Sequence, residues 1–179
     1  AEGFEGCWIL ALGTNESANV AVGSTISEQS RINTMMAVAD GDPVLWVNVK
    51  SIVSGTPYDA ANMEGWNRAL AEACPAWPNM RIYDWRKQVK DDWFTTDGIH
   101  FTSEGYANRA RMIAGALAEA FPPDWEPTNG GRPGDCLVEA PKEALIDESE
   151  VLAPLPGETL EPTPEQISDA VTWPWSGRP

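Results

Sequence analysis

The sequence predicts an α/β fold in which helices cover both faces of a parallel sheet. Two short apolar runs, Trp8–Leu12 and Val44–Val49, lack the polar alternation of half-exposed strands, so each is expected to be a strand buried on both faces, and Met80–Trp85 is expected to be a third strand. Segments with apolar side chains at helical spacing follow these runs. Because strands that alternate with helices favour parallel pairing and right-handed crossovers, we expect a three-layer α/β/α arrangement.

Four helices are expected between and after the strands: Ser17–Val22, Ser27–Ala39, Asp59–Ala73 and a last helix that ends near Phe121. Thr102 or Ser103 can cap the last helix, in which Ile113 and Leu117 lie on one face. The predicted class is thus a partial, flavodoxin-like parallel sheet of about three strands.

Composition limits the possible functions. A chain of 179 residues with 42% hydrophobic residues and nine tryptophans is typical of a globular domain. The formal net charge of −15 argues against binding to nucleic acid, which requires clustered Lys and Arg. No apolar run has the roughly 20 residues of a membrane span. The first residues resemble neither a signal peptide nor a natural start, so we expect a processed or excised piece.

The composition changes at residue 122. Residues 122–179 contain 11 of the 15 prolines and 12 acidic against 3 basic residues. Prolines and like charge favour irregular structure, so we expect a domain over residues 1–121 and an extended, acidic, proline-rich tail over residues 122–179.

The three cysteines, Cys7, Cys74 and Cys136, lack the CxxC pairs of zinc sites, and no metal or cofactor is expected. Cys7 and Cys74 each precede a predicted strand. Both would lie at one end of a parallel sheet, where a disulfide is possible if their Cα atoms approach within about 7 Å. Two buried thiols are the alternative.

Asp97 and His100 form the most informative pair in the sequence. The spacing lets a turning loop direct the carboxylate to one imidazole nitrogen while the other nitrogen faces outward, as in the orienting acid and base of a nucleophilic triad. A histidine that serves only the loop is the alternative.

A second polar segment, Gly13-Thr14-Asn15, follows the first predicted strand. By itself it is typical of an ordinary turn. However, ligands of such folds collect at the carboxyl ends of the strands, where both this segment and the Asp97–His100 loop are expected.

Together, Leu12–Glu16 and Asp97–Tyr106 resemble two signature blocks of the SGNH (GDSL-like) hydrolase superfamily. The resemblance covers residues 7–121, the carboxyl-terminal part of such a domain. It implies that Asn15 donates its amide to an oxyanion, that His100 is the base and that Asp97 orients the imidazole. It also implies a serine esterase or O-acyltransferase without a cofactor. Similar members are often exported and act on acyl esters of envelope glycans or lipids.

The nucleophile that this family requires is missing. No Gly-Asp-Ser block precedes Leu12, and Gly41-Asp42 is followed by Pro43. Ser24, Ser51 and Ser54 lie in predicted loops without signs of activation. We therefore expect a companion segment or chain to carry the serine, because a lone three-stranded sheet would leave an edge exposed. The alternative is a non-catalytic binding or structural module that has lost its nucleophile.

Overall fold

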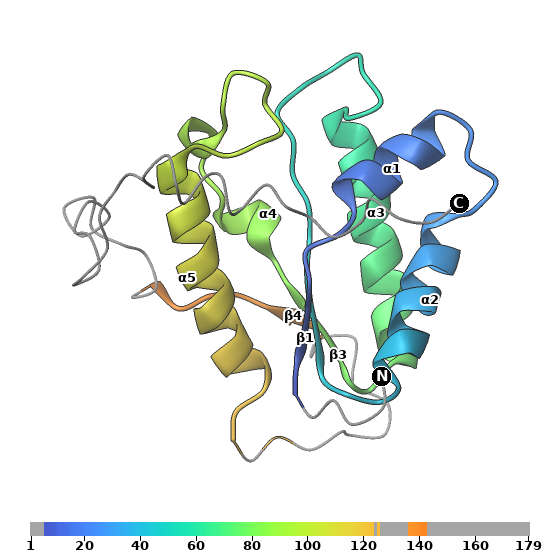
Figure 1. Cartoon of the computed structure of the whole chain (residues 1–179), viewed down its shortest axis with the longest axis vertical. Helices are drawn as coiled ribbons and strands as arrows, with labels where there is room; N and C mark the ends of the chain where they lie inside the picture. The colour runs from blue at the N-terminus through green and yellow to red at the C-terminus, as the bar shows by residue number, and fades with distance from the viewer. Residues whose placement is uncertain (1–5, 124, 126–135, 143–179) are drawn as a thin grey trace, which may run out of the picture. The chain divides into compact units, whose positions relative to one another are not determined.

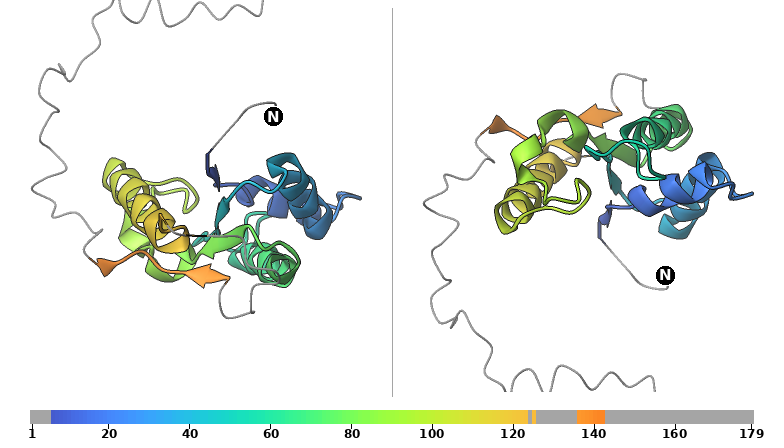
Figure 2. Two further views of the ribbon diagram at one scale, coloured as in Figure 1. Left: turned by 90° about the horizontal axis from the view of Figure 1, so that it is seen from below. Right: turned by 90° about the horizontal axis from the view of Figure 1, so that it is seen from above.

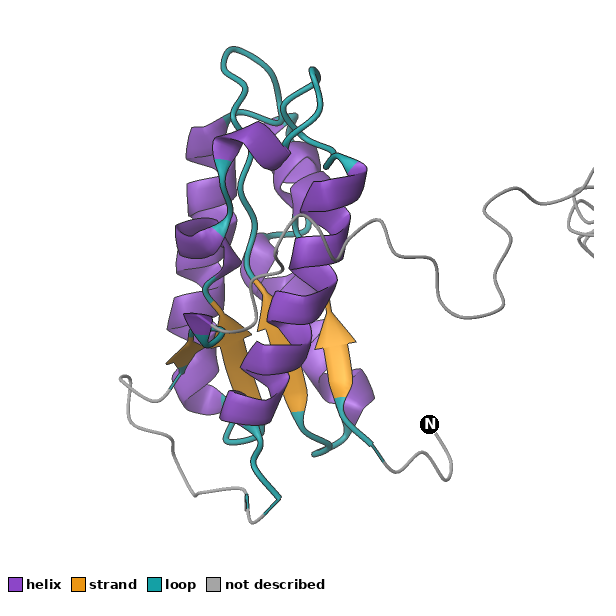
Figure 3. Ribbon diagram, turned by 90° about the vertical axis from the view of Figure 1, so that its left-hand side faces the viewer, coloured by secondary structure: helices purple, strands orange, loops and turns teal. Residues whose placement is uncertain are grey.

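A computed structural model describes residues 6–123, 125 and 136–142, all within one compact unit that spans Ala1–Ile146. It confirms the α/β class. Four parallel strands form one sheet in the order β1 (Trp8–Leu10), β2 (Val44–Val47), β3 (Met80–Tyr83) and β4 (Leu137–Val138). The strand arrows of Figure 3 point the same way, so their carboxyl ends share one edge of the sheet.

Helices lie on both sides of the sheet (Figures 1 and 2). One layer comprises α2 (Glu28–Ala39) and α3 (Ala60–Ala73), with α1 (Thr14–Ala21) packed against both. The other layer contains α5 (Ser103–Ala120) and the single-turn α4 (Trp85–Gln88). No helix in the described part of the chain is both long and apolar enough to cross a membrane.

Strand β2 explains why two hydrophobic cores form. Side chains alternate across a strand, so Val44 and Trp46 enter the core beneath α2 and α3, whereas Leu45 and Val47 enter the core beneath α5. All four are fully buried. The uninterrupted apolar run thus reflects a strand with helices on both faces, as the sequence predicted.

The helix starts agree with the capping residues in the sequence. Ser27, Asp59 and Thr102 occupy N-cap positions, and each side-chain oxygen accepts a backbone N–H from the first turn. The strand predicted to reach Trp85 instead ends at Tyr83. Trp85 begins α4 because its indole packs in the second core and stacks on Trp93, with 6.0 Å between ring centroids.

The sheet has a fourth strand that the sequence did not predict. Leu137 and Val138 lie in the stretch expected to be irregular tail, yet they pair with Ile82 and Tyr83 of β3. The sheet unit therefore includes residues 136–142 and does not end at residue 121. Most of the predicted tail, residues 126–135 and 143–179, lies outside the described residues.

The possible disulfide between Cys7 and Cys74 does not form. Instead Cys74 is bonded to Cys136, with 6.1 Å between their Cα atoms, and Cys7 is free. Strand order explains the difference. Cys7 precedes β1, which lies two strands, or roughly 10 Å, from β3, whereas Cys136 precedes β4, the neighbour of β3.

We predict that Cys7 reacts slowly with thiol reagents. Burial raises the pKa of this thiol to about 11, so only a small fraction is thiolate near pH 8. Ellman's reagent should therefore modify one thiol per chain slowly in the native state and quickly in denaturant without reductant. Rapid labelling of the native protein at pH 8 would contradict the burial of Cys7. Labelling of three thiols per chain in denaturant without reductant would contradict the disulfide.

Candidate active site

The loop that carries His100 is closed on itself between η2 (Asp91–Trp93) and α5. Phe94 and Phe101 form an antiparallel bridge, and the Thr95 N–H donates to the His100 carbonyl at 2.8 Å. Gly98 makes the turn at φ 68°, where a Cβ would also come within 2.7 Å of the Val53 side chain. The Ile52 N–H donates to the Gly98 carbonyl at 3.0 Å, which fixes the loop to the segment after β2.

Within this loop Asp97 and His100 are in direct contact, as their spacing predicted. His100 Nδ1 and Asp97 Oδ2 are 2.6 Å apart. The hydrogen bond from His100, with those from the Ile99 and His100 backbone amides and the Thr95 hydroxyl, holds the pKa of Asp97 well below its usual range. An ionised carboxylate only accepts hydrogen bonds, so Nδ1 carries the proton and Nε2 of the neutral ring keeps its lone pair.

The start of α5 holds this loop against the core. Thr102 caps the helix, and its backbone N–H donates to the Trp93 carbonyl at 2.8 Å. Gly105 lets the helix approach the preceding turn, because a Cβ there would lie 2.6 Å from the Trp93 carbonyl oxygen. Glu104 accepts from the Trp93 indole at 2.9 Å. These contacts give His100 a rigid support.

Asn15 lies in the first turn of α1 and not in a free turn after the strand. The helix begins directly after Gly13, whose N–H donates to the Glu16 carboxylate at 2.8 Å. Gly13 has φ 139°, and a Cβ would come within 2.3 Å of the buried Trp66 indole. A glycine is therefore required where the chain leaves β1, and this close passage over Trp66 positions Asn15.

The Tyr58 hydroxyl donates to Asn15 Oδ1 at 3.3 Å. Asn15 Nδ2 makes no hydrogen bond within the described residues and is available as a donor. This contact between Tyr58 and Asn15 was not predicted, because nothing local marks a loop tyrosine that contacts a residue 43 positions away in the chain.

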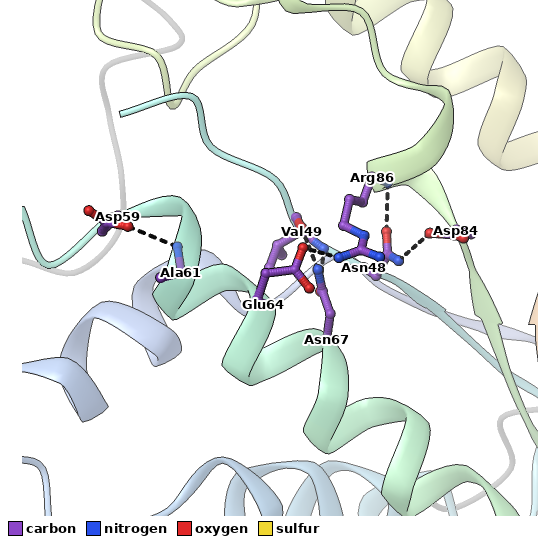
Figure 4. Close-up of polar contacts among 8 residues, drawn as sticks. All are labelled: Asn48, Val49, Asp59, Ala61, Glu64, Asn67, Asp84 and Arg86. Atoms are coloured by element: carbon purple, nitrogen blue, oxygen red, sulfur yellow. Dashed lines mark hydrogen bonds and ion pairs between the residues drawn. The ribbon is translucent and has the colours of Figure 1, made fainter. Parts of the chain in front are cut away.

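A polar cluster anchors the loop before Tyr58 at the end of β2 (Figure 4). The Asn48 amide donates to Asp84 at 2.7 Å, and its oxygen accepts the Arg86 N–H at 2.8 Å. Asn67 of α3 bonds both the N–H and the carbonyl of Val49, at 2.9 and 2.8 Å. These side chains join the ends of β2 and β3 to α3, so the following loop begins from a rigid position.

The two predicted segments meet at one pocket of about 380 Å³. Asn15 and His100 both line it, and Asp97 lies behind His100. Its other lining residues are Ala11, Thr14, Tyr58, Ile99, Phe101, Tyr106 and Arg109. The structure thus brings together Asn15 and His100, which the sequence singled out. It adds Tyr58, Tyr106 and Arg109, to which the sequence assigned no role in the site.

The serines considered from the sequence lie elsewhere. Ser51 is buried, and its hydroxyl donates to the Tyr58 carbonyl at 2.6 Å. Ser24 accepts from Arg31 at 2.8 Å, and Ser54 is exposed. No serine of the described residues lines the pocket, and His100 has 69% of its side chain exposed.

The site offers a base, an amide donor and a guanidinium. His100 can accept a proton at Nε2, Asn15 can donate to an oxygen that becomes negative, and Arg109 adds positive charge. In the part of the chain that the structure describes, no group of three or more His, Cys, Asp and Glu side chains is placed to hold a metal ion. The arrangement suits proton transfer and stabilisation of an oxyanion.

Comparisons with protein-family models, with curated proteins and with solved structures found no match to this chain.

Proposed function

We propose that this chain supplies the base and part of the oxyanion hole of an SGNH-type serine esterase or O-acyltransferase. The observation that carries the proposal is the pocket in which Asn15, from the start of α1, meets His100, from the loop before α5. Asp97 orients the imidazole through its contact with Nδ1.

The chemistry proceeds through an acyl-serine intermediate. His100 Nε2 removes the proton from the serine hydroxyl as it attacks the ester carbonyl, and Asp97 stabilises the imidazolium. Asn15 Nδ2 donates to the oxygen that becomes negative, a contribution of about 3 kcal/mol in comparable sites. The imidazolium then protonates the leaving alcohol, and water or a second alcohol releases the acyl group.

A companion segment or chain supplies the serine in this proposal. Strand β1 is at the edge of the sheet, and no strand among the described residues pairs with its outer side. Ile9 and Leu12 beside this edge are 45% and 39% exposed. Ala11 and Asn15, which follow β1, line the pocket, so a parallel strand added here would end close to His100.

The proposed substrate is a small-molecule, glycan or lipid acyl ester, and the proposed compartment is extracytoplasmic or the cell envelope. The disulfide between Cys74 and Cys136 supports a location outside the cytoplasm, since such bonds persist mainly under oxidising conditions.

A second candidate function is a non-catalytic binding or structural module. It is favoured by the lack of a serine among the described residues that line the pocket. The two candidates differ in one measurable property, the presence of an activated serine beside His100.

A fluorophosphonate probe tests for this serine. The protein is expressed from its complete reading frame, or isolated with its bound partners, and mass spectrometry locates any adduct. We expect one serine to be labelled, and we expect His100→Ala to slow labelling by at least about 100-fold. Thr96→Ala, an exposed change in the same loop, is the control. Absence of labelling in every assembly that contains this chain would favour the non-catalytic module.

A further inference from the structure

The pocket contains a cation, Arg109, for which the described residues provide no counter-ion. Arg109 lies on α5 one turn after Tyr106, and both residues line the pocket. Its Nε is buried and has no hydrogen-bond partner within the described residues. The ion pairs among the described residues involve Lys50, Arg86, Lys87 and His100, and none of them involves Arg109.

Aromatic rings hold the Arg109 side chain in place. Its guanidinium carbon lies 5.7 Å from the centroid of the Trp85 ring and 5.6 Å from that of Phe101. Such contacts stabilise the face of a guanidinium but leave its N–H donors, which lie in the plane, without acceptors. A purely structural arginine would satisfy those donors with carbonyl or carboxylate oxygens.

The charge around the pocket is unusual for this protein. The chain has 27 acidic residues and a formal net charge of −15, yet none of the described residues that line the pocket is Asp or Glu. Burial lowers the pKa of Arg109, but a guanidinium remains charged at neutral pH. The positive charge of Arg109 is therefore partly removed from water, and no carboxylate among the described lining residues neutralises it.

From this arrangement we infer that Arg109 binds an oxyanion of the substrate, so that the ester processed at His100 belongs to an anionic molecule. The inference rests on the proposed function for the ester, but anion binding itself does not. A guanidinium can bind a carboxylate or a phosphate group through two parallel hydrogen bonds, and the aromatic contacts hold it in one orientation. Tyr58 and Tyr106 add hydroxyl groups that can contact a sugar or a headgroup.

Binding measurements on the full chain test the inference without requiring turnover. Glucuronate and inorganic phosphate represent the two anion types, and glucose is the neutral analogue. We expect NMR titration to show that at least one anion shifts the resonances of pocket residues and that glucose has no comparable effect. Arg109→Gln should weaken anion binding by about 10-fold or more. The anion bound more tightly identifies the chemical group.

Arg111→Gln is the matched control, because Arg111 is exposed on the same helix and its replacement removes the same charge. It should change anion affinity less than about twofold. Arg109→Lys retains the positive charge and provides a second test if Arg109→Gln does not fold. It should bind anions less tightly than the wild type because it lacks the two-pronged geometry. Equal binding by Arg109→Lys and the wild type would overturn the two-pronged contact.

Kinetics separate this inference from the proposed function. In the complete protein of the proposed function, Arg109→Gln should lower kcat/KM for an anionic ester, mainly through KM, by a clearly larger factor than it lowers kcat/KM for a neutral ester. Anion binding that is absent, or that Arg109→Gln and Arg111→Gln weaken equally, would overturn the inference. Serine labelling that depends on His100 would still support the proposed function in that case.

Discussion

Replacing His100 with alanine should, on the proposed acyl-serine mechanism, reduce ester turnover at least about 10³-fold, mainly through kcat. The serine would lose the group that accepts its proton, and the leaving alcohol would lose its proton donor. Initial rates with a chromogenic acyl ester provide the measurement. Substrate affinity should change much less, because the imidazole acts in the transition state.

Two further variants show whether the effect is chemical. Asp97→Asn retains the size of the side chain but removes the charge that orients the imidazole, so it should also lower kcat strongly. Thr96→Ala should remain within about twofold of the wild type, because Thr96 is exposed and outside the pocket. An unchanged rate for His100→Ala would exclude His100 as the base.

Removing the disulfide with Cys74→Ala and Cys136→Ala together should lower the free energy of unfolding by about 2–4 kcal/mol. The bond joins residues separated by 62 positions, so its loss increases the conformational entropy of the unfolded chain. Urea denaturation of the oxidised wild type and the double variant measures the difference.

The disulfide should also determine whether β4 stays in the sheet. Strand β4 has only two residues and a few backbone bonds to β3, among them Ile82 N–H to the Cys136 carbonyl at 2.7 Å. Hydrogen exchange at the Ile82 amide should therefore accelerate in the double variant, whereas Cys7→Ala should leave it unchanged. Unchanged stability and exchange in the double variant would contradict this role of the disulfide.

The features that the sequence predicted correctly depend on local rules. Val44–Val49 could be recognised as an interior strand because it is almost entirely apolar, and the strand spans Val44–Val47 of it. Helices were expected to start near Ser27 and Asp59 and to be capped at Thr102 or Ser103, and a cap acts within its own first turn. The contact between Asp97 and His100 spans three residues and follows from loop geometry. The catalytic roles of Asn15, Asp97 and His100 remain predictions.

Several features that depend on distant segments were not predicted. Leu137 and Val138 form a strand because they pair with the edge of β3 and because the disulfide between Cys136 and Cys74 holds them beside it. Their own β propensity does not account for the strand. Arg109 looks like an ordinary helical arginine until Trp85 and Phe101 are placed beside it. Tyr58 likewise has no local signal that indicates contact with Asn15.

The sequence by itself determined the alternation of strands and helices, the helix caps and the Asp97–His100 pair, because each arises from interactions within a few residues. The tertiary structure alone decided that Cys136 is the partner of Cys74, that a fourth strand pairs with β3, and that Arg109 joins Asn15 and His100 in one pocket. Strand order sets these distances, and strand order results from the packing of the whole sheet between its two helical layers.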